Sequence, residues 1–97
     1  MKKYIAIGHY RGSPCTANII STADTMKDFR SHCLDSGFTP WVIISERRFS
    51  VINSNRDDPD KISDEVVKLT TAYWRWSKIT EYIMDHIETF ASEMVNA

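Results

Sequence analysis

The chain of 97 residues is poor in the residue types that interrupt or cross-link a fold, with three glycines, three prolines and two cysteines. Cys15 and Cys33 form no CxxC pair, and the three histidines show no spacing typical of metal ligands. A disulfide framework is therefore not expected, although a single Cys15 to Cys33 bridge remains an alternative. We predict no metal and no cofactor.

Long apolar runs and a strong excess of one charge are also absent. The sequence has no apolar run of about 18 residues, the length that suggests a membrane-spanning helix. Lys2 and Lys3 are followed by a strand pattern and not by the apolar core of a signal peptide. We therefore predict a cytoplasmic protein that does not bind membranes. The formal net charge of -1 does not favour a general polyanion binder.

The charges are unevenly distributed along the chain. Residues 1–52 carry seven Lys/Arg and four Asp/Glu, whereas residues 53–97 carry five and nine. A split of this kind fits two attracting parts of one domain, and it equally fits a basic face offered to a partner. With 42% hydrophobic and 11% aromatic residues, the composition predicts one small domain, residues 1–97.

The first half, residues 1–52, predicts a hairpin, a helix and a strand. Residues 3–10 alternate in polarity and are rich in β-branched and aromatic side chains, residues 11–14 have turn chemistry, and an extended pattern resumes over 15–21. A helix of about three turns is expected after a cap at Asp24 or Thr25, ending near Gly37.

A third strand and a short helix are predicted next. Residues 41–44 form a continuous apolar run that indicates a buried strand, with Pro40 as its first residue. Residues 45–53 fit either a continued strand or a short helix capped by Ser45, and we favour the helix. Asp58 followed by Pro59 is a typical helix start.

The C-terminal segment, residues 59–96, carries an apolar stripe at alternating spacings of three and four that predicts helix. Its members expected in the core or in a self-interface include Leu69, Tyr73, Trp76, Ile83, Ile87, Phe90 and Met94.

A straight helix from Ile62 to Met94 would be about 50 Å long, longer than a domain of this size. It would break, near Thr70 and Thr71 or at Ser77 and Lys78, or else bury its stripe against a second copy. Because neither Gly nor Pro occurs between residues 60 and 97, the sequence favours one long helix and a homodimer.

Two groups of residues are candidates for partner binding. The first is a basic face next to Tyr10, which would track a phosphate backbone if the partner is a nucleic acid. Its members are Arg11, Arg47 and Arg48, together with Lys2, Lys3, Lys27 and Arg30. The second is Trp74 with Arg75, because an exposed Trp beside Arg is typical of a protein interface hot spot. The alternatives are a solvated charged face and a Trp74 that packs under the sheet.

Catalytic chemistry has little support in the sequence. Cys15 near His9 and Arg11 could in principle be an activated thiolate, but no third orienting group accompanies it. The acidic loop at residues 57–60 lacks the Gly and the distal Glu of an EF-hand, and helix capping explains it. We predict no catalytic residues and hold a small thiol enzyme only as a third hypothesis.

The predicted fold is α+β, in the order β-β-α-β-α-α, with a three-stranded antiparallel sheet covered on one face by helices. If the third strand pairs beside the first, the sheet order is 2-1-3, which needs no crossing connections. In size, predicted cytoplasmic character and lack of a catalytic constellation, the chain resembles the small accessory proteins of phages and mobile elements, which include anti-CRISPR and other anti-defence inhibitors. That resemblance implies a non-enzymatic protein whose partner is another protein. A nucleic-acid-binding module is the alternative.

Overall fold

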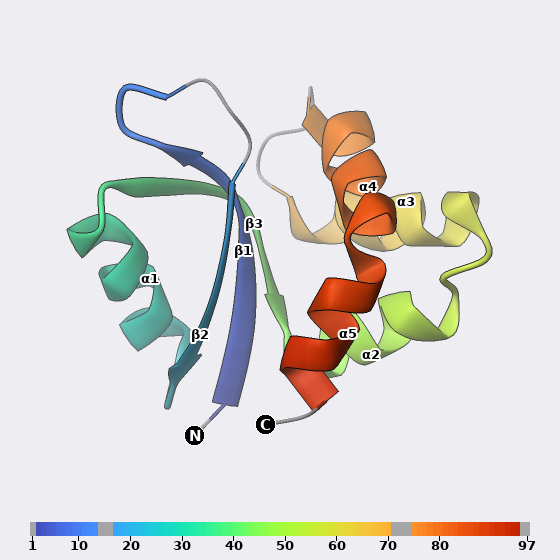
Figure 1. Cartoon of the computed structure of the whole chain (residues 1–97), viewed down its shortest axis with the longest axis horizontal. Helices are drawn as coiled ribbons and strands as arrows, with labels where there is room; N and C mark the ends of the chain where they lie inside the picture. The colour runs from blue at the N-terminus through green and yellow to red at the C-terminus, as the bar shows by residue number, and fades with distance from the viewer. Residues whose placement is uncertain (1, 14–16, 71–74, 96–97) are drawn as a thin grey trace.

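The computed structural model describes residues 2–13, 17–70 and 75–95 (Figure 1). Its elements are the strands β1 (Lys2–Tyr10), β2 (Ala17–Ala23) and β3 (Phe38–Ser45), and the helices α1 (Met26–Asp35), α2 (Glu46–Ser54), α3 (Pro59–Leu69), α4 (Trp76–Asp85) and α5 (Ile87–Val95). No helix in these ranges is both long enough and apolar enough to cross a bilayer.

The three strands form one antiparallel sheet in the order β2-β1-β3, which confirms the predicted α+β class and strand order. β1 is the central strand, and its apolar residues alternate between the two faces. Ile5 and Ile7 belong to one core cluster, whereas Tyr4 and Ala6 belong to another. Both faces of the sheet must therefore be covered.

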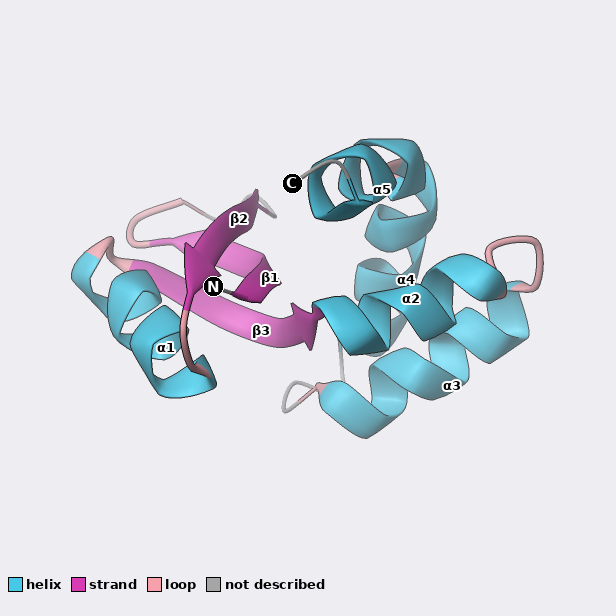
Figure 2. Cartoon of the chain, turned by 90° about the horizontal axis from the view of Figure 1, so that it is seen from below, coloured by secondary structure: helices cyan, strands magenta, loops and turns pink. Residues whose placement is uncertain are grey.

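Helices cover both faces, so the prediction of helices on one face alone is wrong. α1 packs Phe29 and Cys33 against the face that carries Tyr4 and Ala6. α2, α3, α4 and α5 pack against the opposite face, and Figures 1 and 2 show the sheet between α1 and these four helices. The physical reason is that β1 is apolar on both sides, and one helical layer cannot remove both sides from water.

A β-bulge interrupts the pairing of β1 with β3. Ile7 pairs with Val42 and Gly8 pairs with Pro40, so Trp41 has no partner residue on β1. The bulge turns the Trp41 side chain to the same face as Val42, where both join the larger core cluster. Pro40 is the third residue of β3, not the first as predicted, and the irregular pairing tolerates its missing N–H group.

Side-chain caps mark the starts of α1, α2 and α3. The hydroxyl of Thr25 accepts a hydrogen bond from the backbone N–H of Asp28 at the start of α1. Ser45 caps α2 in the same way, which confirms the predicted short helix. Asp58 caps α3, and Pro59 occupies its first turn.

The prediction of a single long C-terminal helix is wrong. α3 ends at Leu69, α4 begins at Trp76 and α5 begins at Ile87, so the first break falls near Thr70 and Thr71, the alternative considered above. The whole chain measures 35 × 30 × 21 Å, too short for a straight helix of about 50 Å. The geometric argument for a homodimer therefore no longer applies, and the homodimer stays a prediction without it.

Thr70 supplies the break that no Gly or Pro provides. Its backbone is extended, with φ of -81° and ψ of 142°, and its hydroxyl donates a hydrogen bond of 2.8 Å to the carbonyl oxygen of Trp41. α3 is thereby tied to the bulge of β3. The chain then returns so that Ile79 and Ile83 of α4 share the core cluster with Ile62 and Val66 of α3.

Replacing Thr70 by valine is expected to lower the free energy of unfolding by about 1–2 kcal/mol, because the buried Trp41 carbonyl loses a donor. Thr80→Val is the matched control. The Thr80 hydroxyl donates to the carbonyl of Trp76 one turn earlier within α4, and its loss should cost less than about 0.5 kcal/mol. Urea denaturation measures both values, and equal losses would contradict a special role for Thr70.

Candidate functional site

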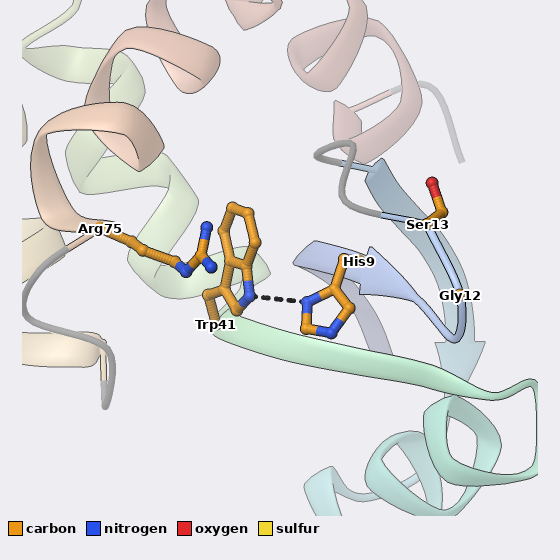
Figure 3. A pocket seen from close by; sticks show the side chains of 5 residues that line it. All are labelled: His9, Gly12, Ser13, Trp41 and Arg75. Atoms are coloured by element: carbon orange, nitrogen blue, oxygen red, sulfur yellow. Dashed lines mark hydrogen bonds between the residues drawn. The ribbon is translucent and has the colours of Figure 1, made fainter.

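An open hollow lies at the end of the sheet where β1 meets the hairpin turn (Figure 3). We call it the sheet-end hollow. It has a volume of about 350 Å³ and is lined by His9, Gly12, Ser13, Trp41 and Arg75. These residues come from β1, the turn after it, the bulge of β3 and the start of α4, so the tertiary fold brings them together.

Trp41 stands at the centre of this hollow and is only 5% exposed. Its indole Nε1–H donates a hydrogen bond of 3.0 Å to Nδ1 of His9. The guanidinium carbon of Arg75 lies 4.2 Å from the centroid of the Trp41 ring, a distance typical of a cation–π contact. Figure 3 shows Arg75 and His9 on different sides of the indole, with Ser13 beyond His9.

Two of the predicted partner-binding residues, Tyr10 and Arg11, lie at the same end of the sheet. The Tyr10 ring meets the ring of Phe38 edge-on, with 5.0 Å between centroids. The backbone N–H of Arg11 donates to the carbonyl oxygen of Gly37 at 2.8 Å, which ties the hairpin turn to the end of α1. These contacts hold the turn in place beside the hollow.

Arg47 and Arg48 lie at the opposite end of the sheet. Along the antiparallel pair, Tyr4 lies opposite Ser45, whereas Tyr10 lies opposite Phe38. Six residues of strand therefore separate Arg11 from the two arginines of α2, a distance of about 20 Å. Arg11 therefore does not lie beside Arg47 and Arg48.

The second basic site is a hollow of about 410 Å³ lined by Lys2, Lys3, Tyr4, Ser45, Glu46 and Arg47. Lys3 in this hollow already forms two hydrogen bonds within the chain. The backbone N–H of Lys3 donates to a carboxylate oxygen of Glu46 at 2.8 Å, and the Lys3 ammonium donates to the carbonyl of Glu93. These contacts leave Lys2 and Arg47 as its exposed cations.

A third concave site, which we call the helix groove, runs between α3 and α4. It has a volume of about 250 Å³ and is lined by Pro59, Asp60, Ser63, Trp76, Ser77, Thr80, Glu81 and Met84. Trp76 is 43% exposed, although the apolar stripe places it in the core or in a self-interface. Trp76 is the first residue of α4 and does not belong to the core cluster that contains Ile79 and Ile83 of the same helix.

The other stripe residues lie where a packed core needs them. Ile83, Phe90 and Met94 are buried in the core cluster, and Leu69 and Ile87 pack against it partly buried. Tyr73 and Trp74 fall outside the described residues, so the predicted Trp74 anchor has no structural account. Trp74 was predicted as an interface residue because an exposed indole would lie next to Arg75 in sequence. Trp76 has both properties: it is exposed and it follows Arg75 directly.

The described residues contain no activated cysteine that would support a small thiol enzyme. Cys33 is a free thiol buried under α1, and burial raises its pKa, partly opposed by the positive charge of Arg30. A raised pKa lowers the thiolate fraction and so the nucleophilicity. Cys15 falls outside the described residues, and its proposed neighbour His9 is bonded to Trp41.

The remaining histidines have packing or surface positions. His86 stacks on Tyr82, with ring centroids 4.1 Å apart, and burial raises the pKa of that tyrosine. His32 is exposed on α1. Within residues 2–13, 17–70 and 75–95, no three His, Cys, Asp or Glu side chains gather closely enough to hold a metal ion.

Comparison with known proteins found no match: no family model, no curated protein and no solved structure resembles the chain significantly.

Proposed function

We propose that this protein is a non-enzymatic binding protein whose partner is another protein, and that the helix groove is its contact surface. The observation that carries the proposal is the exposure of Trp76 at the edge of a groove between two helices. An indole that is 43% exposed keeps a large apolar area in water, which favours a partner that covers it. Tryptophan is also among the residues that contribute most to protein interfaces.

The groove suits an apolar side chain flanked by positive charge. Trp76, Met84 and Pro59 supply apolar surface, whereas the carboxylates of Asp60 and Glu81 are its charged lining groups. Neither carboxylate forms an ion pair in the part of the chain that the structure describes. A partner segment with a Leu, Met or aromatic residue next to Lys or Arg would satisfy both features.

The resemblance to accessory proteins of phages and mobile elements narrows this proposal further. An inhibitor of a host defence complex acts by covering a surface of another protein, and such a role needs a stable fold with an exposed anchor residue. The absence of a recognised catalytic arrangement in the sequence is consistent with this role. We include this narrower role in the proposal.

Trp76→Ala is expected to weaken binding to the partner about 30-fold or more, which corresponds to about 2 kcal/mol. The partner would first be captured from a cell extract on the wild-type protein, then purified, and the Kd measured by calorimetry with each variant. Leu34→Ala is the matched control, because Leu34 is 75% exposed on α1, across the sheet from the groove. This control should bind like the wild type.

Two results would overturn the proposal. One is a captured protein that binds Trp76→Ala as tightly as the wild type. The other is a purified binding partner that proves to be a nucleic acid, with binding lost in Arg47→Glu/Arg48→Glu and retained in Trp76→Ala. That second outcome would favour the basic end of the sheet as the functional surface.

A further inference from the structure

Arg75 carries a charge that nothing in the described structure neutralises. Among the described residues its guanidinium forms no ion pair and no hydrogen bond, and its one recorded contact is the face of Trp41. The described residues that line the sheet-end hollow are His9, Gly12, Ser13, Trp41 and Arg75, and none of these carries a carboxylate. This described lining is therefore concave and cationic.

The hydrogen bond between Trp41 and His9 orders one wall of the hollow. An indole N–H can only donate, so Nδ1 of His9 accepts and faces Trp41. Because Trp41 is buried and held by the bulge and by Thr70, the ring of His9 is fixed in turn. Its Nε2 lies on the side of the ring away from Trp41 and Arg75, so Arg75 is the charged donor of the hollow (Figure 3).

The contact with Trp41 also orders the guanidinium. A stacked Arg side chain loses less conformational freedom when it binds a ligand, and its planar fork of N–H donors matches the oxygens of a carboxylate or phosphate group. The volume of about 350 Å³ is large enough for a small anion together with its water. Arg75 thus combines a free charge, a fixed position and room beside it.

We propose that the sheet-end hollow binds a small oxyanion, a phosphate or carboxylate group, with Arg75 as its charge partner. This site is separate from the helix groove, although Arg75 and Trp76 are adjacent in sequence. The basic hollow at the other end of the sheet is a weaker candidate, because the Glu46 carboxylate lines it and the Lys3 ammonium already donates to the backbone carbonyl of Glu93. The inference does not depend on the proposed function.

Titration of the wild-type protein with inorganic phosphate, at constant ionic strength, is the test. In ¹H–¹⁵N spectra the indole N–H of Trp41 and the amide of Gly12 should shift and saturate, with a Kd of about 1 mM or tighter. Acetate and adenosine monophosphate, titrated separately, distinguish a carboxylate from a phosphate and show whether an organic group adds affinity. Resonances of Lys2 and Arg47 should stay unchanged.

Arg75→Gln is expected to weaken phosphate binding at least tenfold, since the glutamine keeps the polar side chain but loses the charge. Arg48→Gln is the control, because Arg48 is an exposed arginine at the other end of the sheet, and it should bind phosphate like the wild type. The proposal fails if no anion gives a saturable shift, if both variants lose affinity equally, or if Arg75→Gln binds as tightly as the wild type. If Arg75→Gln does not fold, the wild-type titration decides the proposal. Saturable shifts at Trp41 and Gly12 would support it, and shifts only at Lys2 and Arg47 would overturn it.

Discussion

Ile83→Glu is expected to unfold the protein. Ile83 is fully buried in α4 and belongs to the core cluster that joins the four C-terminal helices to the sheet. A carboxylate there has no cation in that cluster to pair with, and burying it costs about 3–5 kcal/mol or more. Since a domain of this size has a total stability of about 5–15 kcal/mol, the variant should lose most or all of its folded state.

Circular dichroism and light scattering would check this expectation together. Val67→Glu is the matched control, because Val67 is 36% exposed on α3, and its substitution should leave the fold and the solution mass unchanged. The alternative from the sequence is a homodimer that buries the apolar stripe in a self-interface, and a charge at Ile83 would convert such a dimer to a folded monomer. A folded, monomeric Ile83→Glu beside a dimeric wild type would contradict the structure and restore that alternative.

Gly8→Ala is the second substitution with a large expected effect. A Cβ atom at Gly8 would lie 1.9 Å from the carbonyl oxygen of Thr39 and 2.9 Å from the Cα of Pro40, both of them backbone atoms. Such atoms cannot move aside without separating β1 from β3 at the bulge. We expect a loss of about 4 kcal/mol or more in the free energy of unfolding, beyond the range of ordinary point substitutions.

Gly12→Ala is the control, because it tests the cost of a positive φ without the steric clash that is expected at Gly8. Gly12 has a φ of +78°, yet a Cβ there would meet no atom within 4 Å. Its substitution should therefore cost only the roughly 1–2 kcal/mol of placing a non-glycine residue in the left-handed region. Thermal denaturation ranks the two variants, and a Gly8→Ala protein as stable as Gly12→Ala would show that the bulge tolerates a side chain.

The elements that depend on neighbouring residues could be predicted from the sequence. The alternation of residues 3–10, the Ser45 and Asp58 caps and the stripe of the C-terminal segment are all local signals, and each corresponds to an observed strand, cap or helix. The antiparallel order 2-1-3 was predicted on the condition that the third strand pairs beside the first, and the structure shows this pairing. Local chemistry thus determined the class of the fold and most of its elements.

The candidate sites could not be predicted in this way, because they depend on where distant segments meet. The bulge that turns Trp41 towards His9 arises from the pairing of Gly8 with Pro40, and the hydrogen bond from Thr70 to Trp41 ends α3. After the resulting break, Trp76 is the first residue of α4 and is exposed, whereas Ile83 of the same helix is buried.

The sequence by itself therefore determined the strands, the helix caps and the stripe, because each depends on spacing within a few residues. Tertiary structure decided which residues of the stripe are buried, which arginines lie together and where the long helix breaks. The physical reason is that burial and hydrogen bonding between distant segments outweigh the small free energy by which an unbroken helix would be favoured locally.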